Sequence, residues 1–273
     1  MQITDKIKLQ LNNWWEVLLP FIESEEWDKL FAFLKSQSAL KKVIIPKSID
    51  LFKSFEISDR HKVKAVIVMM DPYPSITKEG IMVADGIPMS CVNTGRLQPT
   101  LELFYGAIEN SYLGFDPDMD MRPNISYLVK EEGVLLLNSS LSCEKDKPGS
   151  HAGMWTPFMK FFIEEVLNKY YRGLPIVLCG AQAQKLEKYI QPMLHHVKCI
   201  EHPVAASYQN RSWNYQDLFK WCNTIIESNN GIGHGVRWYR KKNESTEPLP
   251  EWVTKKTVIK YENTNTGKSD LPW

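Results

Sequence analysis

Short, mostly apolar runs recur along the chain, and each is followed by a small or polar residue. Four such runs are Val66–Met70 before Asp71, Val134–Leu137 before Asn138, Ile176–Cys179 before Gly180, and Val197–Ile200 shortly before His202. Runs of this length are typical of strands that are buried on both faces of a parallel sheet. Because ligands gather at the carboxyl ends of parallel strands, we expect a carboxylate, an amide and an imidazole to meet at one edge of the sheet.

Stretches with helical periodicity separate these runs. Residues Trp14–Lys35 carry apolar side chains at helical intervals, which predicts one or two amphipathic helices, broken at Pro20. We expect further helices over Leu101–Glu109 and Trp155–Lys169, a short one within 46–61, and loops over 115–124 and 144–149. The alternation predicts an α/β fold with helices on both faces of the sheet.

Length and composition favour one large domain with an appended segment. The chain has 273 residues, of which 43% are hydrophobic, so it can bury one sizeable core. We place the domain at residues 1–230 and a C-terminal basic extension at 231–273, whose net charge is +3. Basic residues beside Trp238 and Tyr239 could follow a phosphate backbone or bind a partner protein, although a solvated tail is the simpler interpretation.

Charge and cysteine usage exclude several classes of protein. A net charge of +1 argues against a non-specific polyanion binder, and we find neither a membrane-spanning run nor a signal peptide. We therefore expect a soluble, intracellular protein. The five cysteines lack paired metal-ligand spacing and mostly adjoin apolar strand residues, which indicates reduced packing thiols and no metal site. We find no phosphate-binding glycine loop and expect no cofactor.

Five segments resemble motifs of the family 1 uracil-DNA glycosylases, in the same order and at similar spacing. Residues 62–74 (KVKAVIVMMDPYP) resemble the water-activating motif usually written GQDPYH, and residues 202–207 (HPVAAS) are similar to HPSPLS. The other three segments are residues 133–138, 150–155 and 180–185. One match alone is a weak signal, but five in register indicate the family. The resemblance implies a three-layer α/β/α fold with a central, mainly parallel four-stranded sheet, and excision of uracil from DNA.

The resemblance assigns the chemistry to two side chains. Asp71 matches the family carboxylate, which orients the attacking water and places negative charge near a sugar of oxocarbenium character. His202 matches the imidazole that donates to uracil O2, and a neutral ring suffices because it keeps its proton. Taken alone, Asp71 before Pro72 is more typical of a turn, and His202 before Pro203 of a strand end. Their joint occurrence with Asn138 favours catalysis.

Four residues are expected to bind the base after it leaves the duplex stack. The amide of Asn138 can pair with N3–H and O4 of uracil, whereas cytosine presents the inverse pattern. Tyr73 matches the family residue that excludes the methyl group of thymine. Met70 and Met89 fall where the family has a Gln and a stacking Phe. The resemblance also implies contacts to the DNA backbone or base stack by Gln98, Pro99, Thr100, Ser150, Ser207, Ala206, Tyr208 and Arg211.

Several departures from the family pattern bear on activity. Met70 and Pro74 remove two polar side chains of the water-activating motif, and Met89 removes an aromatic face. Ala206 replaces the Leu that wedges into the vacated stack, so we expect poorer flipping from a duplex unless Tyr208, Gln209 or Arg211 takes that role.

These observations leave three hypotheses open. The first is a uracil-DNA glycosylase of weakened activity, with a larger relative preference for single strands than ordinary family members show. The second is a glycosylase of the same fold that acts on another pyrimidine. The third is a non-catalytic DNA-binding or scaffold protein, because a fold does not guarantee an activity.

Overall fold

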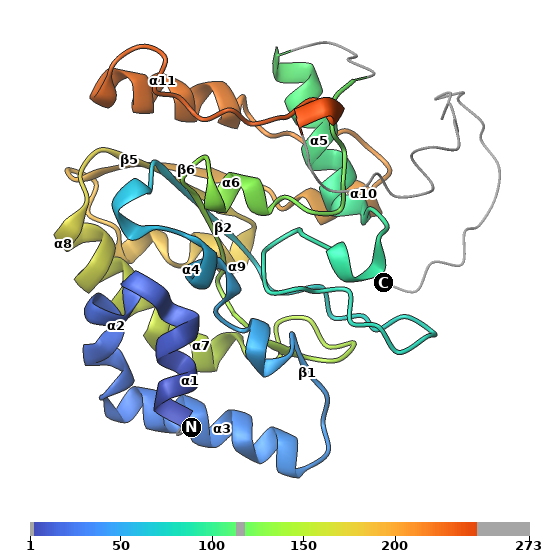
Figure 1. Ribbon diagram of the computed structural model, residues 1–273, viewed down its shortest axis with the longest axis vertical. Helices are drawn as coiled ribbons and strands as arrows, with labels where there is room; N and C mark the ends of the chain where they lie inside the picture. The colour runs from blue at the N-terminus through green and yellow to red at the C-terminus, as the bar shows by residue number, and fades with distance from the viewer. Residues whose placement is uncertain (1–2, 113–117, 245–273) are drawn as a thin grey trace.

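The computed structural model describes residues 3–112 and 118–244 and is built around one parallel sheet (Figure 1). Its four strands, in spatial order β3-β2-β5-β6, are β3 (Val134–Asn138), β2 (Ala65–Met69), β5 (Leu174–Cys179) and β6 (His195–Ile200). Each neighbouring pair is parallel. The predicted sheet is therefore confirmed, and the predicted strand bounds differ from the observed ones by at most two residues.

Alternate side chains of each strand enter two separate cores. In β2, Ala65, Ile67 and Met69 point into one core. Val66 and Val68 point into the other. All five side chains are buried, because helices cover both faces of the sheet.

Figure 1 shows the three layers, with the sheet between two groups of helices. Four helices contribute to the core that contains Ile67, namely α5 (Pro99–Tyr112), α6 (Ser126–Lys130), α10 (Pro203–Tyr208) and α11 (Leu218–Asn230). The opposite core receives side chains from α1 (Ile3–Leu11), α2 (Trp15–Ile22), α3 (Glu25–Ala39), α4 (Lys53–Ile57), α7 (Ala152–Phe161) and α9 (Ala181–Gln184). Helix α7 continues through a π-helical stretch (Phe162–Leu167) into α8 (Asn168–Tyr170).

The predicted break at Pro20 is wrong. Pro20 lies inside α2, and the chain turns instead at Glu23 and Ser24, where the Ser24 hydroxyl accepts a hydrogen bond from the backbone N–H of Trp27. Four buried side chains of α2 outweigh the one backbone hydrogen bond that the proline removes. The serine cap, rather than the proline, sets where α3 begins.

A small antiparallel ribbon outside the main sheet was not predicted. It pairs β1 (Ile44–Ile45) with β4 (Cys143–Glu144). Two residues are too few to give a periodic signal in the sequence. The ribbon fixes the start of the 144–149 loop, which approaches the carboxyl edge of the sheet.

The first part of the predicted C-terminal extension packs on the domain. We call residues 231–244 the C-terminal strap. Its Trp238 side chain is only 1% exposed and its indole N–H donates to Asn223 of α11, while the Tyr127 hydroxyl donates to the Trp238 carbonyl. Arg240 pairs with Glu131, and Arg237 pairs with Glu132 and Glu244. Trp238 is therefore not part of a solvated tail, and its buried ring has no face free to stack on a nucleic acid. Residues 245–273 lie outside the described residues.

Candidate active site

The carboxyl ends of three strands bring the predicted site residues to one edge of the sheet. Asn138 ends β3 and is the register partner of Met69, the last residue of the neighbouring β2. Gly180 follows β5, and its N–H donates to the carbonyl of Ile200, the last residue of β6. The residues that follow these strands, Asp71 and His202 among them, begin at the same edge.

At Gly180, two of these segments approach each other closely. Its φ is +86°, and a Cβ built there would lie 2.9 Å from the Cβ of His202 and 3.2 Å from the Sδ of Met70. Any side chain at this position would therefore be strained in the backbone and would also collide with its neighbours. The glycine lets Met70, beside Asp71, approach His202.

His202 is held as a neutral imidazole with a defined orientation. It caps the N-terminus of α10, where its Nδ1 accepts a hydrogen bond of 3.2 Å from the backbone N–H of Val204. Burial lowers the pKa of His202 to about 4. Since Nδ1 is the acceptor, the ring proton of the neutral form sits on Nε2, which is available as a donor.

Asp71 follows β2, and two serines hold the carbonyl of the residue before it. Its Oδ2 accepts a hydrogen bond of 2.6 Å from the backbone N–H of Gly149 in the 144–149 loop. Burial raises the pKa of Asp71, and this hydrogen bond opposes the shift. The carbonyl of Met70 accepts from the Ser139 hydroxyl and the Ser140 N–H, which fixes the turn after β2 against the turn after β3.

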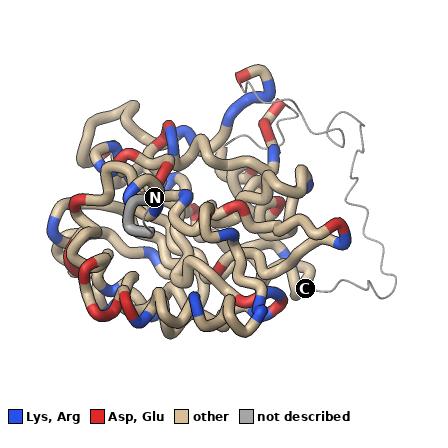
Figure 2. Tube along the Cα trace, turned by 60° about the horizontal axis from the view of Figure 1, so that its bottom comes forward, with Lys and Arg blue, Asp and Glu red and all other residues tan. Residues whose placement is uncertain are grey.

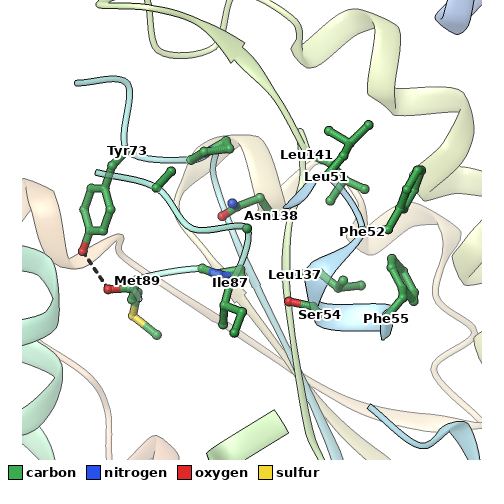
Figure 3. A pocket seen from close by; sticks show the side chains of 14 residues that line it. Leu51, Phe52, Ser54, Phe55, Tyr73, Ile87, Met89, Leu137, Asn138 and Leu141 are labelled. Carbon is green, nitrogen blue, oxygen red and sulfur yellow. Dashed lines mark hydrogen bonds between the residues drawn. The ribbon is translucent and has the colours of Figure 1, made fainter. Parts of the chain in front are cut away.

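A small cavity of about 20 Å³, room for roughly one water molecule, lies beside Asn138. Figure 3 shows Tyr73 and Met89 on one side of Asn138, with Leu137 and Ser54 on the other. The Asn138 side chain is nearly buried, at 6% exposure. Apolar side chains make up most of the lining, so a polar ligand edge placed here would find its hydrogen-bonding partner in the Asn138 amide.

Tyr73 and Met89 are tied together at the cavity wall. The Tyr73 hydroxyl donates a hydrogen bond of 3.2 Å to the Met89 carbonyl (Figure 3). Burial is the main cause that raises the pKa of Tyr73 well above its ordinary value, so the phenol stays protonated. Met89 is buried and has a φ of +66°, which is unusual for a residue with a side chain.

A buried carboxylate that the sequence analysis missed organises this wall. Asp85 accepts hydrogen bonds from the backbone N–H groups of Ile87 and Val92 and from the Ser90 hydroxyl. Burial raises the pKa of Asp85, and the three hydrogen bonds oppose the shift. We call residues 85–92 the 85–92 loop. The hydrogen bonds of Asp85 hold this loop, and with it Met89 in its left-handed conformation. The sequence analysis missed Asp85 because a single acid before a glycine forms no recognisable motif.

The predicted contacts to the DNA backbone are scattered along this side of the fold. Gln98, Pro99 and Thr100 lie at the start of α5, and Thr100 is buried. The Ser150 hydroxyl accepts from the backbone N–H of Glu144. Ser207 lies in α10.

Three residues near the end of α10 differ in how they meet solvent. Ala206 is fully buried in the core and presents no surface to a duplex. Tyr208, at the last position of α10, is 67% exposed. Arg211 is engaged by Glu201, the residue before His202, with hydrogen bonds of 2.7 and 2.5 Å between its Nη atoms and the two carboxylate oxygens. Tyr208 is thus the member of this trio that is exposed and uncommitted to an ion pair.

Glu201 is the second residue that the sequence analysis missed. Arg211 is the main cause that lowers the pKa of Glu201 to about 2, so the carboxylate is ionised at any ordinary pH. The signal in the sequence was an acidic residue directly before the His-Pro pair and an arginine ten residues later. Hydrophobic periodicity does not show that an acid before a short helix pairs with an arginine after it.

Metal-binding clusters and membrane-spanning helices are both absent from the described residues. Residues 3–112 and 118–244 contain no group of three or more His, Cys, Asp or Glu side chains placed to hold a metal ion. Within the same ranges, none of the helices is both long and apolar enough to cross a membrane. The five cysteines are all free thiols. Figure 2 shows Lys and Arg interspersed with Asp and Glu along the trace.

Known proteins share both the sequence and the fold. The chain is 33% identical over 229 residues to a uracil-DNA glycosylase of Pseudomonas aeruginosa, covering 82% of this chain and 93% of that one. A uracil-DNA glycosylase of Bacillus cereus is 34% identical over 218 residues, with 79% and 91% of the two chains covered.

Solved structures agree in fold. The mimivirus uracil-DNA glycosylase superposes with a TM-score of 0.75 at 23% identity, covering 86% of this chain and 91% of that one. A glycosylase of this kind from Nitratifractor salsuginis gives a TM-score of 0.55 at 19% identity, with 82% and 96% covered. No family model matches the sequence. The sequence relatives nevertheless span most of both chains, and this protein belongs to the uracil-DNA glycosylase family.

Proposed function

We propose that this protein excises uracil from DNA by hydrolysing the bond between the base and deoxyribose. The observation that supports this proposal is the packing around Gly180, which Met70, next to Asp71, and His202 both approach from segments far apart in the sequence. Asn138 ends the adjoining strand and lines the neighbouring cavity. A carboxylate, a neutral donor and an amide at one sheet edge suit a planar base whose sugar bond is to be cleaved by water.

In this mechanism, Asp71 and His202 stabilise opposite charges as the bond breaks. The ionised Asp71 orients the attacking water and offsets the positive character of the sugar. Nε2 of His202 donates to the O2 atom of the departing base while negative charge grows there. The lowered pKa of His202 supports this role, because a neutral ring donates without first losing a proton to solvent.

The base is read by Asn138 and bounded by Tyr73, Met70 and Met89. The Asn138 amide accepts from N3–H and donates to O4, and cytosine would leave both groups unpaired. The hydrogen bond from Tyr73 to the Met89 carbonyl supports a fixed position for the ring that excludes the thymine methyl group. Met89 covers the base with a thioether in place of an aromatic face.

Contact with DNA relies on hydroxyls, backbone N–H groups and one exposed ring. Gln98, Pro99, Ser150 and Ser207 are proposed to contact the backbone at little cost in net charge, whereas Thr100 is buried and is not. Tyr208 is proposed as the residue that fills the vacated stack, since Ala206 is buried and Tyr208 is 67% exposed. A helix-end tyrosine inserts less deeply than a flexible wedge, so single-stranded substrates are preferred.

The decisive experiment measures release of free uracil from single-stranded and duplex oligonucleotides, with thymine, cytosine and other modified pyrimidines as controls. We expect release from uracil substrates alone, faster from single strands. Asp71→Asn should lower the rate about 10³-fold. Asp146→Asn, an exposed carboxylate in the adjacent 144–149 loop, is the matched control and should leave the rate unchanged. The absence of abasic sites at high enzyme concentration would favour a scaffold protein, and release of another pyrimidine alone would favour altered specificity.

The pH profile tests the protonation states of the pair. Burial raises the pKa of Asp71, so the rate should fall as pH drops through that raised pKa and the carboxylate becomes neutral. His202, with a pKa of about 4, should stay a neutral donor above pH 5. We therefore expect that His202 causes no step in the rate between pH 6 and 8. A step near pH 6.5, as for an ordinary histidine, would contradict the proposed state of His202.

A further inference from the structure

The residue directly before His202 is the centre of a hydrogen-bond cluster. The two carboxylate oxygens of Glu201 accept from Nη1 and Nη2 of Arg211, at 2.7 and 2.5 Å. One of these oxygens also accepts from the backbone N–H of Asn214, at 3.0 Å. The backbone carbonyl of Glu201 accepts from the indole N–H of Trp213, at 3.0 Å. Glu201 thus joins the end of β6 to the chain that leaves α10.

Arg211 is committed to this cluster on all three of its nitrogens. Besides the two bonds to Glu201, its Nε donates to the Gln209 side chain and its Nη1 to the Ser212 carbonyl. A guanidinium held by a bidentate carboxylate and two further acceptors has little capacity left for a phosphate. An isolated exposed ion pair contributes little, but this one is supported by backbone and indole donors to the same glutamate.

The cluster closes a short loop that contains two of the proposed site residues. Helix α10 is only six residues long and carries His202 at its N-cap and Tyr208 at its last position. A helix of this length is marginal without tertiary support. Its buried residues are Pro203 and Ala206, and the ion pair between the segments on either side of the helix adds a polar restraint to this packing.

We propose that Glu201 and Arg211 form a clamp that positions His202 and Tyr208, and that Arg211 is a positioning residue rather than a contact to DNA phosphate. This inference rests on the proposed excision of uracil. The clamp acts through the loop it closes: it keeps Nε2 of His202 at a fixed place against the base and keeps the Tyr208 ring at the mouth of the site. Loss of either partner should therefore lower kcat and leave DNA binding largely intact.

A double-mutant cycle tests whether the two residues act as one unit. Glu201→Gln and Arg211→Ala are each expected to lower kcat about 10-fold, and the double variant should also be about 10-fold slower, because the second change removes nothing further. A double variant that is about 100-fold slower would show independent roles and overturn the proposal. Arg237→Ala is the matched control. It removes an exposed, paired arginine of the C-terminal strap and should leave kcat unchanged.

The salt dependence of DNA binding separates a clamp from a phosphate contact. For Arg211→Ala, we expect the slope of log affinity against log salt concentration to equal that of the unaltered protein. A slope reduced by about one would mean that Arg211 neutralises a phosphate, and the proposal would fail. If Arg211→Ala or Glu201→Gln does not fold, Arg211→Lys carries the test, since an ammonium keeps the charge but cannot form the fork. Arg211→Lys should then lower kcat without changing the slope, and an unchanged kcat would overturn the clamp.

A measurement that does not depend on catalysis tests the clamp separately from the proposed function. The pKa of His202, followed by NMR titration of its ring, should rise in Glu201→Gln because the loosened loop lets water reach the imidazole. An unaltered pKa in this variant would overturn the clamp. If the unaltered protein releases no uracil, the proposed function fails, and this titration still decides whether Glu201 and Arg211 position His202.

Discussion

The two walls of the candidate site are held by carboxylates in opposite environments. On the wall formed by the 85–92 loop, Asp85 is 7% exposed and all its bonds stay inside the loop. On the wall formed by α10, the Glu201 side chain is 27% exposed and its main partner, Arg211, is 40% exposed. The first wall is fixed by buried hydrogen bonds, for which water cannot substitute. The second wall is fixed by solvent-exposed hydrogen bonds, for which water can substitute.

This difference suggests that the two walls have different roles. A wall that contacts the base must keep its shape, because a one-ångström displacement is costly to specificity and rate. The α10 wall also meets the DNA through Tyr208, so it must accommodate a large ligand. Exposed ion pairs exchange with water at low cost, which lets the Tyr208 end of this wall adjust to the DNA while Glu201 and Arg211 hold the His202 end.

The largest effect that tests this comparison is expected for Asp85→Asn. The substituted amide puts N–H groups where Asp85 accepts from Val92, so a buried backbone donor loses its partner. We expect a loss of about 2 kcal/mol in the free energy of unfolding and about 10-fold in kcat/KM. Denaturant melts and uracil release measure the two effects. Ser111→Ala, a buried serine of α5 bonded only to its own helix, should leave kcat/KM unchanged. Equal losses in the two variants would mean that the 85–92 loop needs no such anchor.

A smaller effect distinguishes the walls by the sign of their pH dependence. The pKa of Glu201 is lowered to about 2, so its stabilisation is present above pH 4.5 and is lost as pH falls toward 2. Burial raises the pKa of Asp85, so the linked stabilisation is present below pH 3.8 and is lost as pH rises through the raised value. In thermal melts, the Tm advantage of the unaltered protein over Glu201→Gln should grow from pH 2 to 4.5. Its advantage over Asp85→Asn should shrink as pH rises above 3.8, and parallel curves would remove the distinction.

The smallest effect concerns salt. At 1 M salt, charges at the surface are screened within about 3 Å, whereas buried bonds are little affected. We expect 1 M salt to weaken the Glu201–Arg211 pair and thereby to lower kcat, measured at saturating single-stranded substrate, about 2-fold. The same measurement on Glu201→Gln should show no further fall, and Asp85→Asn should keep the response. If kcat of Glu201→Gln still fell at 1 M salt, a charged group other than the Glu201–Arg211 pair would cause the salt dependence.

Sequence patterns predicted the sheet, its two covered faces and the strand ends that carry Asp71, Asn138 and His202. They could do so because strand burial and strand polarity are local properties that recur at short intervals. The position of Pro20 inside α2 was missed, since tertiary burial of the helix outweighed a local rule. The pairing of β1 with β4 was missed because each strand has only two residues.

The residues that hold the site in place were harder to find than those proposed to carry its chemistry. Asp85 bonds within its own loop, and Glu201 bonds across a helix to Arg211, so neither forms a recognisable motif. Arg211 was assigned to the DNA or the base stack because it follows Ala206 closely in the sequence, and its pairing with Glu201 leaves no signal in the sequence. Trp238 was assigned to a solvent-exposed extension, because an aromatic residue among lysines and arginines does not show whether it is buried.

The C-terminal strap also has a consequence for how the protein folds during synthesis. Strands β2, β3, β5 and β6 leave the ribosome well before Trp238, yet Trp238 packs on Phe219 in the same core as Ile67. Chains are made from the N-terminus, so the nascent sheet waits with one face incompletely covered until the strap arrives. A chain that ended before residue 238 would therefore lack one of the large side chains of this core and would be more prone to aggregate.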